Sequence, residues 1–182
     1  MLQMNVIDNL KGFSVSDVKN YCQQKTIDAI VAMINIEGDF NISTMIRNAN
    51  FFGFDRVYNI SPRKKWDKRG SVGTHHYTTI QHFYTEEDFI ENNRDRTIIA
   101  VENNIPNFAN KTVDLFTKHN LYYRPVFVFG SENMGLSDYI LENSDEIITL
   151  QNYGSVRSLN VGTTSGIIMS YYRHLYQTNT GA

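Results

Sequence analysis

The stretch VFVFGSENMGLS (Val126–Ser137) joins an uninterrupted apolar run to a loop of small and polar residues. Consecutive apolar residues without polar alternation are typical of a strand that is covered on both faces, as in a parallel sheet. The glycines that follow let backbone amide groups approach a ligand closely. The loop matches neither a dinucleotide-binding fingerprint nor a P-loop. This stretch therefore predicts an α/β protein with a ligand loop after a buried strand.

Four more strand-like runs occur along the chain, and because most of the runs are continuously apolar they support a mostly parallel sheet flanked by helices. They are Ala29–Ile34, Arg56–Ile60, Thr97–Val101 and Glu146–Leu150. Between them, helix starts are marked by capping residues, Ser14 ahead of Asp17 and Thr85 ahead of three acidic residues. An apolar stripe predicts a helix over 41–53 that Asn41 caps and Gly53 ends. A last helix is expected over Leu159–Tyr176.

The size and composition of the chain favour one soluble domain. It has 182 residues, of which 41% are hydrophobic, and a net charge of −2. We expect a single domain over 1–182, with 1–27 as a helical extension packed on the domain or on a partner subunit, and a frayed tail over 177–182. Neither a signal peptide nor a membrane span is expected, and the single cysteine, Cys22, fits a reducing cytoplasm.

One cluster of cations stands out in this weakly acidic chain. Five basic residues fall within seven positions around Trp66: Arg63, Lys64, Lys65, Lys68 and Arg69. Such a loop could hold RNA phosphates while Trp66 stacks on an unpaired base, or it could be an ordinary solvated loop.

Arg47 projects away from the apolar stripe of its own helix, together with Phe51. An aromatic residue beside an arginine on an outward face suggests a second contact, which a partner subunit would supply. A solvated arginine is the alternative.

A second polar loop, over 150–162, also follows a strand and precedes a helix. Loops at the carboxyl ends of parallel strands bind ligands, so we expect both loops to share one pocket. Glu132 could face this pocket and pair with Arg47, or be a plain surface carboxylate. No metal site is expected, because His75 and His76 would point to opposite sides of an extended chain and no zinc-like spacing occurs.

Three segments together resemble the motifs of TrmH (SpoU) proteins of the SPOUT superfamily. The first is Asn41-x5-Arg47-Asn48-Ala49 followed by Phe52-Gly53. The second is Phe129-Gly130-Ser131-Glu132 with Gly135-Leu136-Ser137, and the third is Gly154-Ser155-Val156-Arg157-Ser158-Leu159-Asn160-Val161. The resemblance covers about Asp28 to Tyr176. One departure is Asn133-Met134, where many relatives carry a smaller residue such as glycine.

This resemblance implies an RNA ribose 2′-O-methyltransferase that uses S-adenosyl-L-methionine and acts on tRNA or rRNA. It also implies a trefoil knot in the carboxyl-terminal part of the sheet and a homodimer with active sites near the subunit boundary. The implied catalytic residues are Arg47, Asn41, Glu132, Ser158 and Asn160. The implied cofactor contacts are Val101, Gly130, Ser131, Gly135, Leu150 and Leu159.

A guanidinium stays protonated at neutral pH and is therefore a poor base. We therefore expect Arg47 to grip a phosphate and stabilise oxyanion charge, with Asn41 and Glu132 orienting it. A noncatalytic RNA-binding dimer of the same fold is the alternative function, and a base methyltransferase is another. Without a separate RNA-binding domain, recognition would rest on the core, the Ser14 helix and the loop over 63–69.

Overall fold

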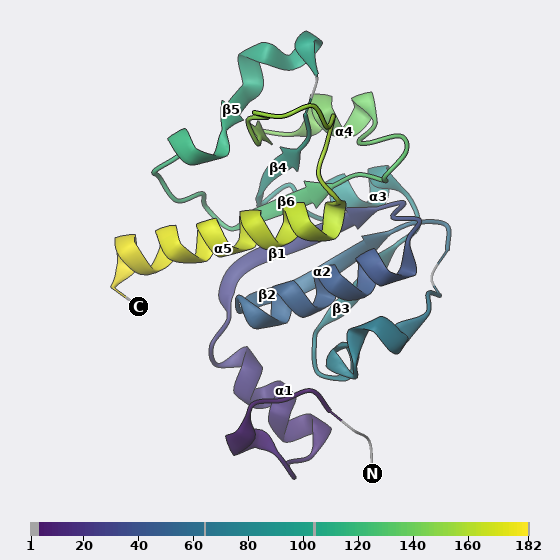
Figure 1. Ribbon diagram of the computed structural model, residues 1–182, viewed down its shortest axis with the longest axis vertical. Coiled ribbons are helices and arrows are strands. Elements are labelled where there is room, and N and C mark those ends of the chain that lie inside the picture. Colours follow the sequence, from purple (N-terminus) through teal and green to yellow (C-terminus); the bar gives the residue numbers. More distant parts are fainter. Residues whose placement is uncertain (1–3, 64, 104, 182) are drawn as a thin grey trace.

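A seven-stranded sheet forms the centre of the protein in a computed structural model that describes residues 4–63, 65–103 and 105–181 (Figure 1). The strand order is β3-β2-β1-β6-β4-β7-β5, and every neighbouring pair is parallel. The strands are β1 (Ile27–Ile34), β2 (Phe54–Ile60), β3 (Ile80–Phe83), β4 (Thr97–Val101), β5 (Thr112–Asp114), β6 (Pro125–Phe129) and β7 (Glu146–Thr149). The predicted parallel α/β fold is confirmed.

Helices cover both faces of this sheet. Figure 1 shows α2 and α5 side by side on one face, and α3 and α4 pack on the other. The α-helices are α1 (Val15–Gln23), α2 (Asp39–Phe51), α3 (Glu86–Glu91), α4 (Asp138–Asn143) and α5 (Val161–Thr180). Short 3₁₀ helices are η1 (Asp8–Leu10), η2 (Lys68–Ser71), η3 (Thr74–His76), η4 (Pro106–Lys111) and η5 (Leu115–Thr117).

The uninterrupted apolar runs have a direct cause in these two covered faces. Along β1, Val31 and Met33 belong to the core beneath α2 and α5, while Ile30 and Ala32 belong to the core on the opposite face. Alternate strand residues point to opposite faces, so a strand buried on both faces must be apolar at every position.

Two edge strands were not predicted. β3 carries Gln81 and His82, and β5 has only three residues, all partly buried. Edge strands bury less surface than central strands, so their sequences carry a weaker apolar pattern.

The predicted helix bounds need three corrections. Helix α2 begins at Asp39 after Gly38, so Asn41 lies inside the first turn and does not cap it. Helix α5 begins at Val161, with Asn160 as its capping residue. It continues to Thr180, so the tail is not frayed at Gln177. Its last turn gains hydrogen bonds from the Thr178, Asn179 and Thr180 side chains to carbonyl groups four residues earlier. The predicted stop at Gly53 is confirmed, since its φ is +69°.

The N-terminal segment packs against its own chain. Ser14 caps α1 as expected, accepting a hydrogen bond from the Asp17 amide at 3.2 Å. Leu10 and Val18 form a small buried cluster with Tyr77, whose hydroxyl donates to the Asn5 carbonyl at 2.7 Å. The segment is thereby anchored beside η3.

Charged pairs join the amino ends of three adjacent strands. Asp28 at the start of β1 accepts from Arg96 before β4 at 2.6 Å and from Arg124 before β6 at 2.9 Å. Arg124 also pairs with Asp95. Burial opposes ionisation of Asp28, but the hydrogen bonds from the two arginines outweigh it and lower its pKa. The end of the sheet opposite the ligand loops is thus held by ion pairs.

No helix within the described ranges is both long enough and apolar enough to cross a membrane.

Candidate functional site

A pocket of about 610 Å³ lies at the carboxyl ends of β4, β6 and β7. Nine of the residues implicated by the sequence line it: Val101, Gly130, Ser131, Glu132, Gly135, Leu150, Ser158, Leu159 and Asn160. The two polar loops predicted to share one cavity therefore do so.

The loop after β6 is a tight turn built on two glycines. The Gly135 amide donates to the Ser131 carbonyl at 2.9 Å, and the Met134 amide donates to Ser131 Oγ at 3.2 Å. A Cβ atom at Gly130 would lie 2.2 Å from the carbonyl carbon of Gly135. Because no side chain fits at Gly130, the backbone alone forms this wall of the pocket.

Glu132 connects this loop to the start of α2. Its Oε2 accepts from the Glu37 amide at 3.0 Å, and its Oε1 accepts from the Gly38 amide at 3.2 Å and from Asn41 Nδ2 at 2.6 Å. Asn160 Nδ2 then donates to Asn41 Oδ1 at 3.1 Å. Asn41 is therefore a bridge between the second and third motif segments.

The surroundings of Glu132 favour its charged form. Burial opposes ionisation, but the hydrogen bonds from Asn41 and from the amides of Glu37 and Gly38 outweigh that cost. The pKa of Glu132 is consequently below its ordinary value. A carboxylate fully ionised at neutral pH accepts hydrogen bonds only, so Glu132 acts here as an acceptor that fixes donors.

Two polar residues of the pocket were missed by the sequence reasoning, Glu102 and Asn103 after β4. Asn103 Nδ2 donates to the Leu150 carbonyl at 3.1 Å, and the Leu150 amide donates to Asn103 Oδ1 at 3.1 Å. This reciprocal pair joins the ends of β4 and β7. The signal was available, because both residues directly follow a predicted strand, as the two recognised loops do.

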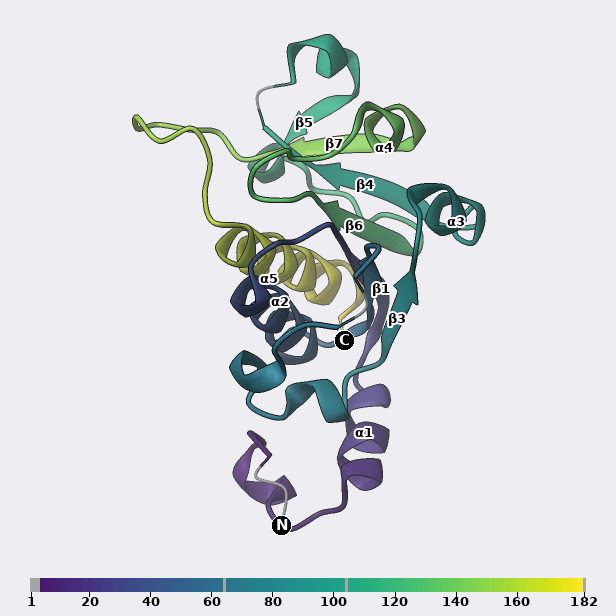
Figure 2. The same ribbon diagram turned by 90° about the vertical axis from the view of Figure 1, so that its right-hand side faces the viewer.

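The third motif segment is exposed. Figure 2 shows the loop between β7 and α5 extending away from the body of the molecule, and residues 151–160 are all exposed. Tyr153 is 89% exposed and Val156 is 61% exposed. Ser158 lies within this loop, so its side chain is presented at the surface of the pocket.

Arg47 does not join this site within its own chain. It lines a different groove of about 990 Å³, between α2 and the N-terminal segment, together with Phe51, Tyr77 and Cys22. Among the described residues no hydrogen bond or ion pair links Arg47 to Glu132, so the expected pairing is wrong within one chain. The physical reason is helical geometry: Asn41 and Arg47 are six residues apart, which places them on different faces of α2.

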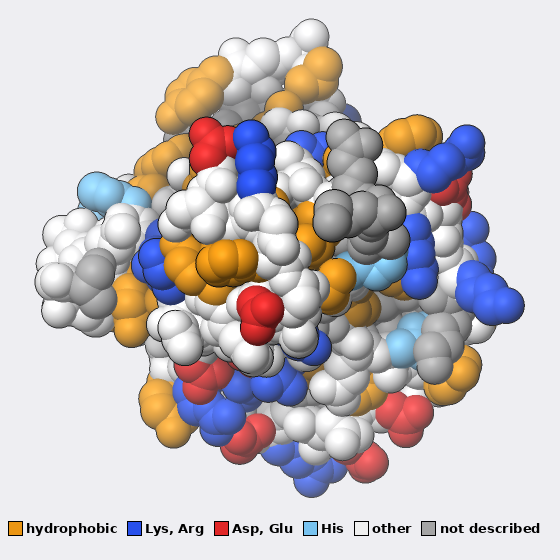
Figure 3. All heavy atoms as spheres, turned by 90° about the horizontal axis from the view of Figure 1, so that it is seen from below, with side chains coloured by type: hydrophobic (Ala, Val, Ile, Leu, Met, Phe, Trp, Pro, Cys, Tyr) orange, Lys and Arg blue, Asp and Glu red, His pale blue; other side chains and the backbone are white. Residues whose placement is uncertain are grey.

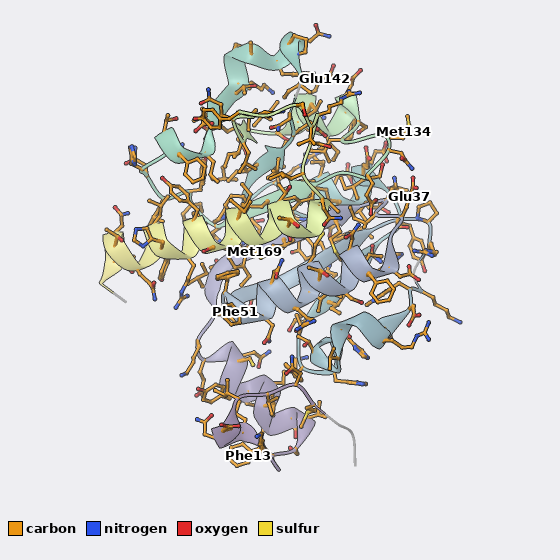
Figure 4. All side chains as sticks on the ribbon, viewed as in Figure 1. Phe13, Glu37, Phe51, Met134, Glu142 and Met169 are labelled. Atoms are coloured by element: carbon orange, nitrogen blue, oxygen red, sulfur yellow. The ribbon has the colours of Figure 1, made fainter. Side chains whose placement is uncertain are left out.

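Phe51 is 83% exposed beside Arg47, as predicted for the outward face. Figure 4 shows it at the end of α2 opposite to Glu37. The outward face of α2 thus carries an exposed aromatic ring next to an exposed cation.

A profile of the SpoU rRNA Methylase family matches residues 28–170. The chain belongs to this family. The match spans the motif segments and all seven strands except Ile27, the first residue of β1, and it leaves the N-terminal helix α1 outside.

Relatives of this SpoU family chain share its fold over most of its length. A tRNA (guanosine(18)-2'-O)-methyltransferase of Aquifex aeolicus is 27% identical over 158 residues, 84% of this chain and 72% of the relative. The crystal structure of the A. aeolicus TrmH/SpoU tRNA modifying enzyme matches with a TM-score of 0.77 and 22% identity, covering 92% of this chain and 84% of that one.

The AdoMet-bound rRNA methyltransferase from Sinorhizobium meliloti matches with a TM-score of 0.70 and 21% identity. The match covers 86% of this chain and 59% of that chain. This SpoU family chain therefore spans only about three fifths of the length of the S. meliloti protein.

The basic loop of this SpoU family chain is partly neutralised. Arg63 pairs with Asp39 at 2.6 Å, and Arg69 pairs with Asp67 at 2.5 Å. Lys64 lies outside the described residues. Among the described residues of the loop, Lys65 and Lys68 are exposed lysines, and Lys68 Nζ lies 5.5 Å from the centroid of the Trp66 ring.

Trp66, which the sequence suggested could stack on a base, is partly buried and packs against the core beneath α2 and α5. The ring therefore anchors the loop to the domain.

Figure 3, which views the molecule from the end that carries the N-terminal segment, shows Lys and Arg side chains interspersed with acidic and apolar ones. This face carries no continuous basic surface among the side chains drawn there.

Within the described residues, no three His, Cys, Asp or Glu side chains come together as metal ligands would. His75 and His76 do not point apart as expected for an extended chain. They lie in the 3₁₀ helix η3 with ring centroids 4.0 Å apart, and Ser71 Oγ is hydrogen-bonded to His75 Nδ1.

Proposed function

We propose that this chain is an S-adenosyl-L-methionine-dependent RNA methyltransferase that methylates a ribose 2′-hydroxyl in tRNA or rRNA. The observation that carries the proposal is the shared pocket at the ends of β4, β6 and β7, in a chain of the SpoU family. The relatives named above act on these two classes of RNA.

The pocket fits an adenosine cofactor. Val101, Leu150 and Leu159 supply apolar contacts for a purine ring, and the turn over Gly130, Ser131 and Gly135 supplies backbone groups at close approach. Its volume of about 610 Å³ is that of a typical small-molecule site. S-adenosylmethionine supplies the methyl group when bound. Asn160 and Ser158 line the same pocket and would shape it toward the ribose.

In this proposal Arg47 acts as an electrostatic group toward the RNA. Its guanidinium binds the phosphate next to the target nucleotide and stabilises the negative charge that develops on the 2′-oxygen as this oxygen loses its proton. The proton passes to phosphate or water, because a guanidinium stays protonated at neutral pH. The exposed position of Arg47 supports this role, since an RNA strand can reach it.

Arg47 would act on the pocket of a second copy of the chain, in a homodimer. Two observations support the dimer: Arg47 lies outside the pocket of its own chain, and the exposed Phe51 ring beside it would be covered by a partner. The proposal includes a trefoil knot in the part of the chain that contains β6, β7 and α5, and a single domain over 1–182. A cytoplasmic location is part of it as well.

Calorimetry with S-adenosylmethionine, followed by mapping of 2′-O-methylation in RNA from cells with and without the gene, tests the proposed function. We expect a heat of binding and the loss of at least one methylated position. If the protein binds RNA but shows no heat of binding with S-adenosylmethionine, the noncatalytic RNA-binding dimer is favoured instead. Loss of a methylated base in place of a methylated ribose would favour the base methyltransferase.

The dimer and the role of Arg47 can be tested together by mixing two inactive variants. Arg47→Ala should abolish methyl transfer while cofactor affinity is unchanged, and Leu159→Glu should block the pocket. After equal mixing and exchange of subunits, about one quarter of the wild-type activity should return, because half of the dimers hold one complete site. Absence of any recovery with subunits shown to exchange would contradict a site shared between two copies.

A further inference from the structure

Glu102 has a position in the pocket that the motif residues do not explain. It directly follows β4, and its Oε2 accepts from the Leu136 amide at 3.0 Å, while its Oε1 accepts from the Asn103 amide at 2.9 Å. A Cβ atom at Gly135 would lie 2.5 Å from Glu102 Oε2. The carboxylate is therefore pressed against the turn that forms one wall of the pocket.

The two carboxylates that line this pocket differ in how many hydrogen bonds they accept from the protein. A carboxylate can accept about four hydrogen bonds. Glu132 already accepts from two backbone amides and from Asn41, all at the start of α2. Among the described residues Glu102 accepts from two backbone amides only. Glu102 is thus the pocket carboxylate with the larger remaining capacity.

The neighbours of Glu102 indicate which part of the cofactor it would meet. Val101 precedes it, and Leu150 is tied to the adjacent residue by the Asn103 pair. These are the apolar residues proposed to hold the purine ring, and the ribose is bonded directly to that ring. A carboxylate at the carboxyl end of a parallel strand is well suited to accept hydrogen bonds from ribose hydroxyl groups.

We infer that Glu102 is a cofactor-binding residue, whose carboxylate accepts hydrogen bonds from the ribose hydroxyl groups of S-adenosylmethionine. This inference rests on the proposed function. It assigns Glu102 two tasks at once: it holds the Leu136 amide, and with it the turn at Gly135, and it presents its free acceptor positions to the ribose.

The test is calorimetry of the full chain with S-adenosylhomocysteine and with its 2′-deoxy and 3′-deoxy analogues. The wild-type protein should bind the parent compound about tenfold more tightly than at least one deoxy analogue, because the unpaired carboxylate is then left buried against the ligand. In Glu102→Gln the parent affinity should fall and the difference between parent and analogue should shrink to less than about threefold.

Glu142→Gln is the matched control, since Glu142 lies on α4 outside the pocket (Figure 4) and should keep the full discrimination. If Glu102 had a purely structural role, Glu102→Gln would weaken the binding of all three ligands equally. The affinity difference between the parent compound and its deoxy analogues would then be unchanged, which would overturn the inference. If Glu102→Gln does not fold, Glu102→Asp, whose shorter carboxylate should bind the parent compound more weakly and discriminate less, takes its place; equal binding of all three ligands by the wild type overturns the inference without any variant.

Failure of the two proposals gives different results. A wild-type protein that binds none of the three ligands contradicts the proposed function and this inference together. A wild-type protein that binds all three equally contradicts only the role of Glu102.

Discussion

Asn41 and Glu132, which are 91 residues apart in the sequence, are joined by a hydrogen bond of 2.6 Å from Asn41 Nδ2 to Glu132 Oε1. The other end of the Asn41 amide accepts from Asn160 at 3.1 Å. A single side chain therefore ties the loop after β6 to the start of α5. The geometry of the pocket depends on this bridge.

Removing the bridge should loosen the pocket and lower the stability of the fold. Asn41→Ala leaves Glu132 and Asn160 each without one partner, so we expect a loss of about 1 kcal/mol in the free energy of unfolding and weaker cofactor binding. Denaturant unfolding and calorimetry measure the two effects. Asn92→Ala is the control, because among the described residues the Asn92 side chain donates only to the Asp88 carbonyl of the adjoining helix α3. Equal behaviour of both variants would contradict a bridging role.

The lowered pKa of Glu132 predicts a stability contribution that depends on pH. Because the folded-state pKa lies below the ordinary value of 4.5, the unfolded chain binds the proton more readily. The contribution is fully present above pH 4.5 and is lost as the pH falls through the folded-state pKa. Unfolding of the wild type and of Glu132→Gln, compared at each pH, isolates this group. The stability difference should shrink on acidification; a difference that grows would show the opposite sign of the pKa shift.

Gly130 and Gly154 should respond very differently to the same substitution. A Cβ atom at Gly130 would meet the backbone at 2.2 Å, whereas at Gly154 the nearest atom is Asn152 Oδ1 at 3.9 Å. Gly130→Ala should destabilise the protein by about 1–3 kcal/mol or more and abolish cofactor binding, because backbone must move. Gly154→Ala should be nearly neutral in thermal unfolding. A neutral Gly130→Ala variant would mean that the loop after β6 is looser than described.

Two exposed lysines of the basic loop should contribute to the salt dependence of RNA binding. Neutralising Lys65 and Lys68 together should reduce the slope of log affinity against log salt by about 1.4 to 1.8, if each contacts one phosphate. Arg69→Gln, in the same loop, should change the slope less, because its guanidinium is paired with Asp67. Titrations at several salt concentrations decide; an unchanged slope in the double lysine variant would make the loop an ordinary solvated one.

The central strands and the pocket loops could be predicted because their sequences are locally constrained. Strands buried on both faces must be apolar throughout, and glycines are needed where backbone segments touch, as at Gly130. The helix caps at Ser14 and Thr85 could be predicted for the same reason, because the capping oxygen comes from the residue just before the helix and accepts from an amide three residues later.

The features that were missed depend on contacts between distant segments. Asn41 has the residue type of a helix cap, and only the position of Glu132 makes it a bridge. Trp66 lies in a loop whose basic composition is typical of RNA-binding loops, but its ring packs against the core. Glu102 follows a predicted strand but belongs to no motif segment, and only the fold brings the Leu136 amide onto its carboxylate. Sequence patterns report local constraints, and these three depend on tertiary ones.

The ion pairs of Asp28, Arg96 and Arg124 lie at the end of the sheet that faces away from the pocket. Three central strands are therefore fixed at the end away from the pocket. Outside the tight turn at Gly130 and Gly135, we expect the loops at the opposite ends to tolerate changes of length and of side chains, because these ion pairs hold the strands independently. An engineer seeking a new nucleotide specificity should accordingly vary the loops after β4, β6 and β7 and leave the charged end untouched.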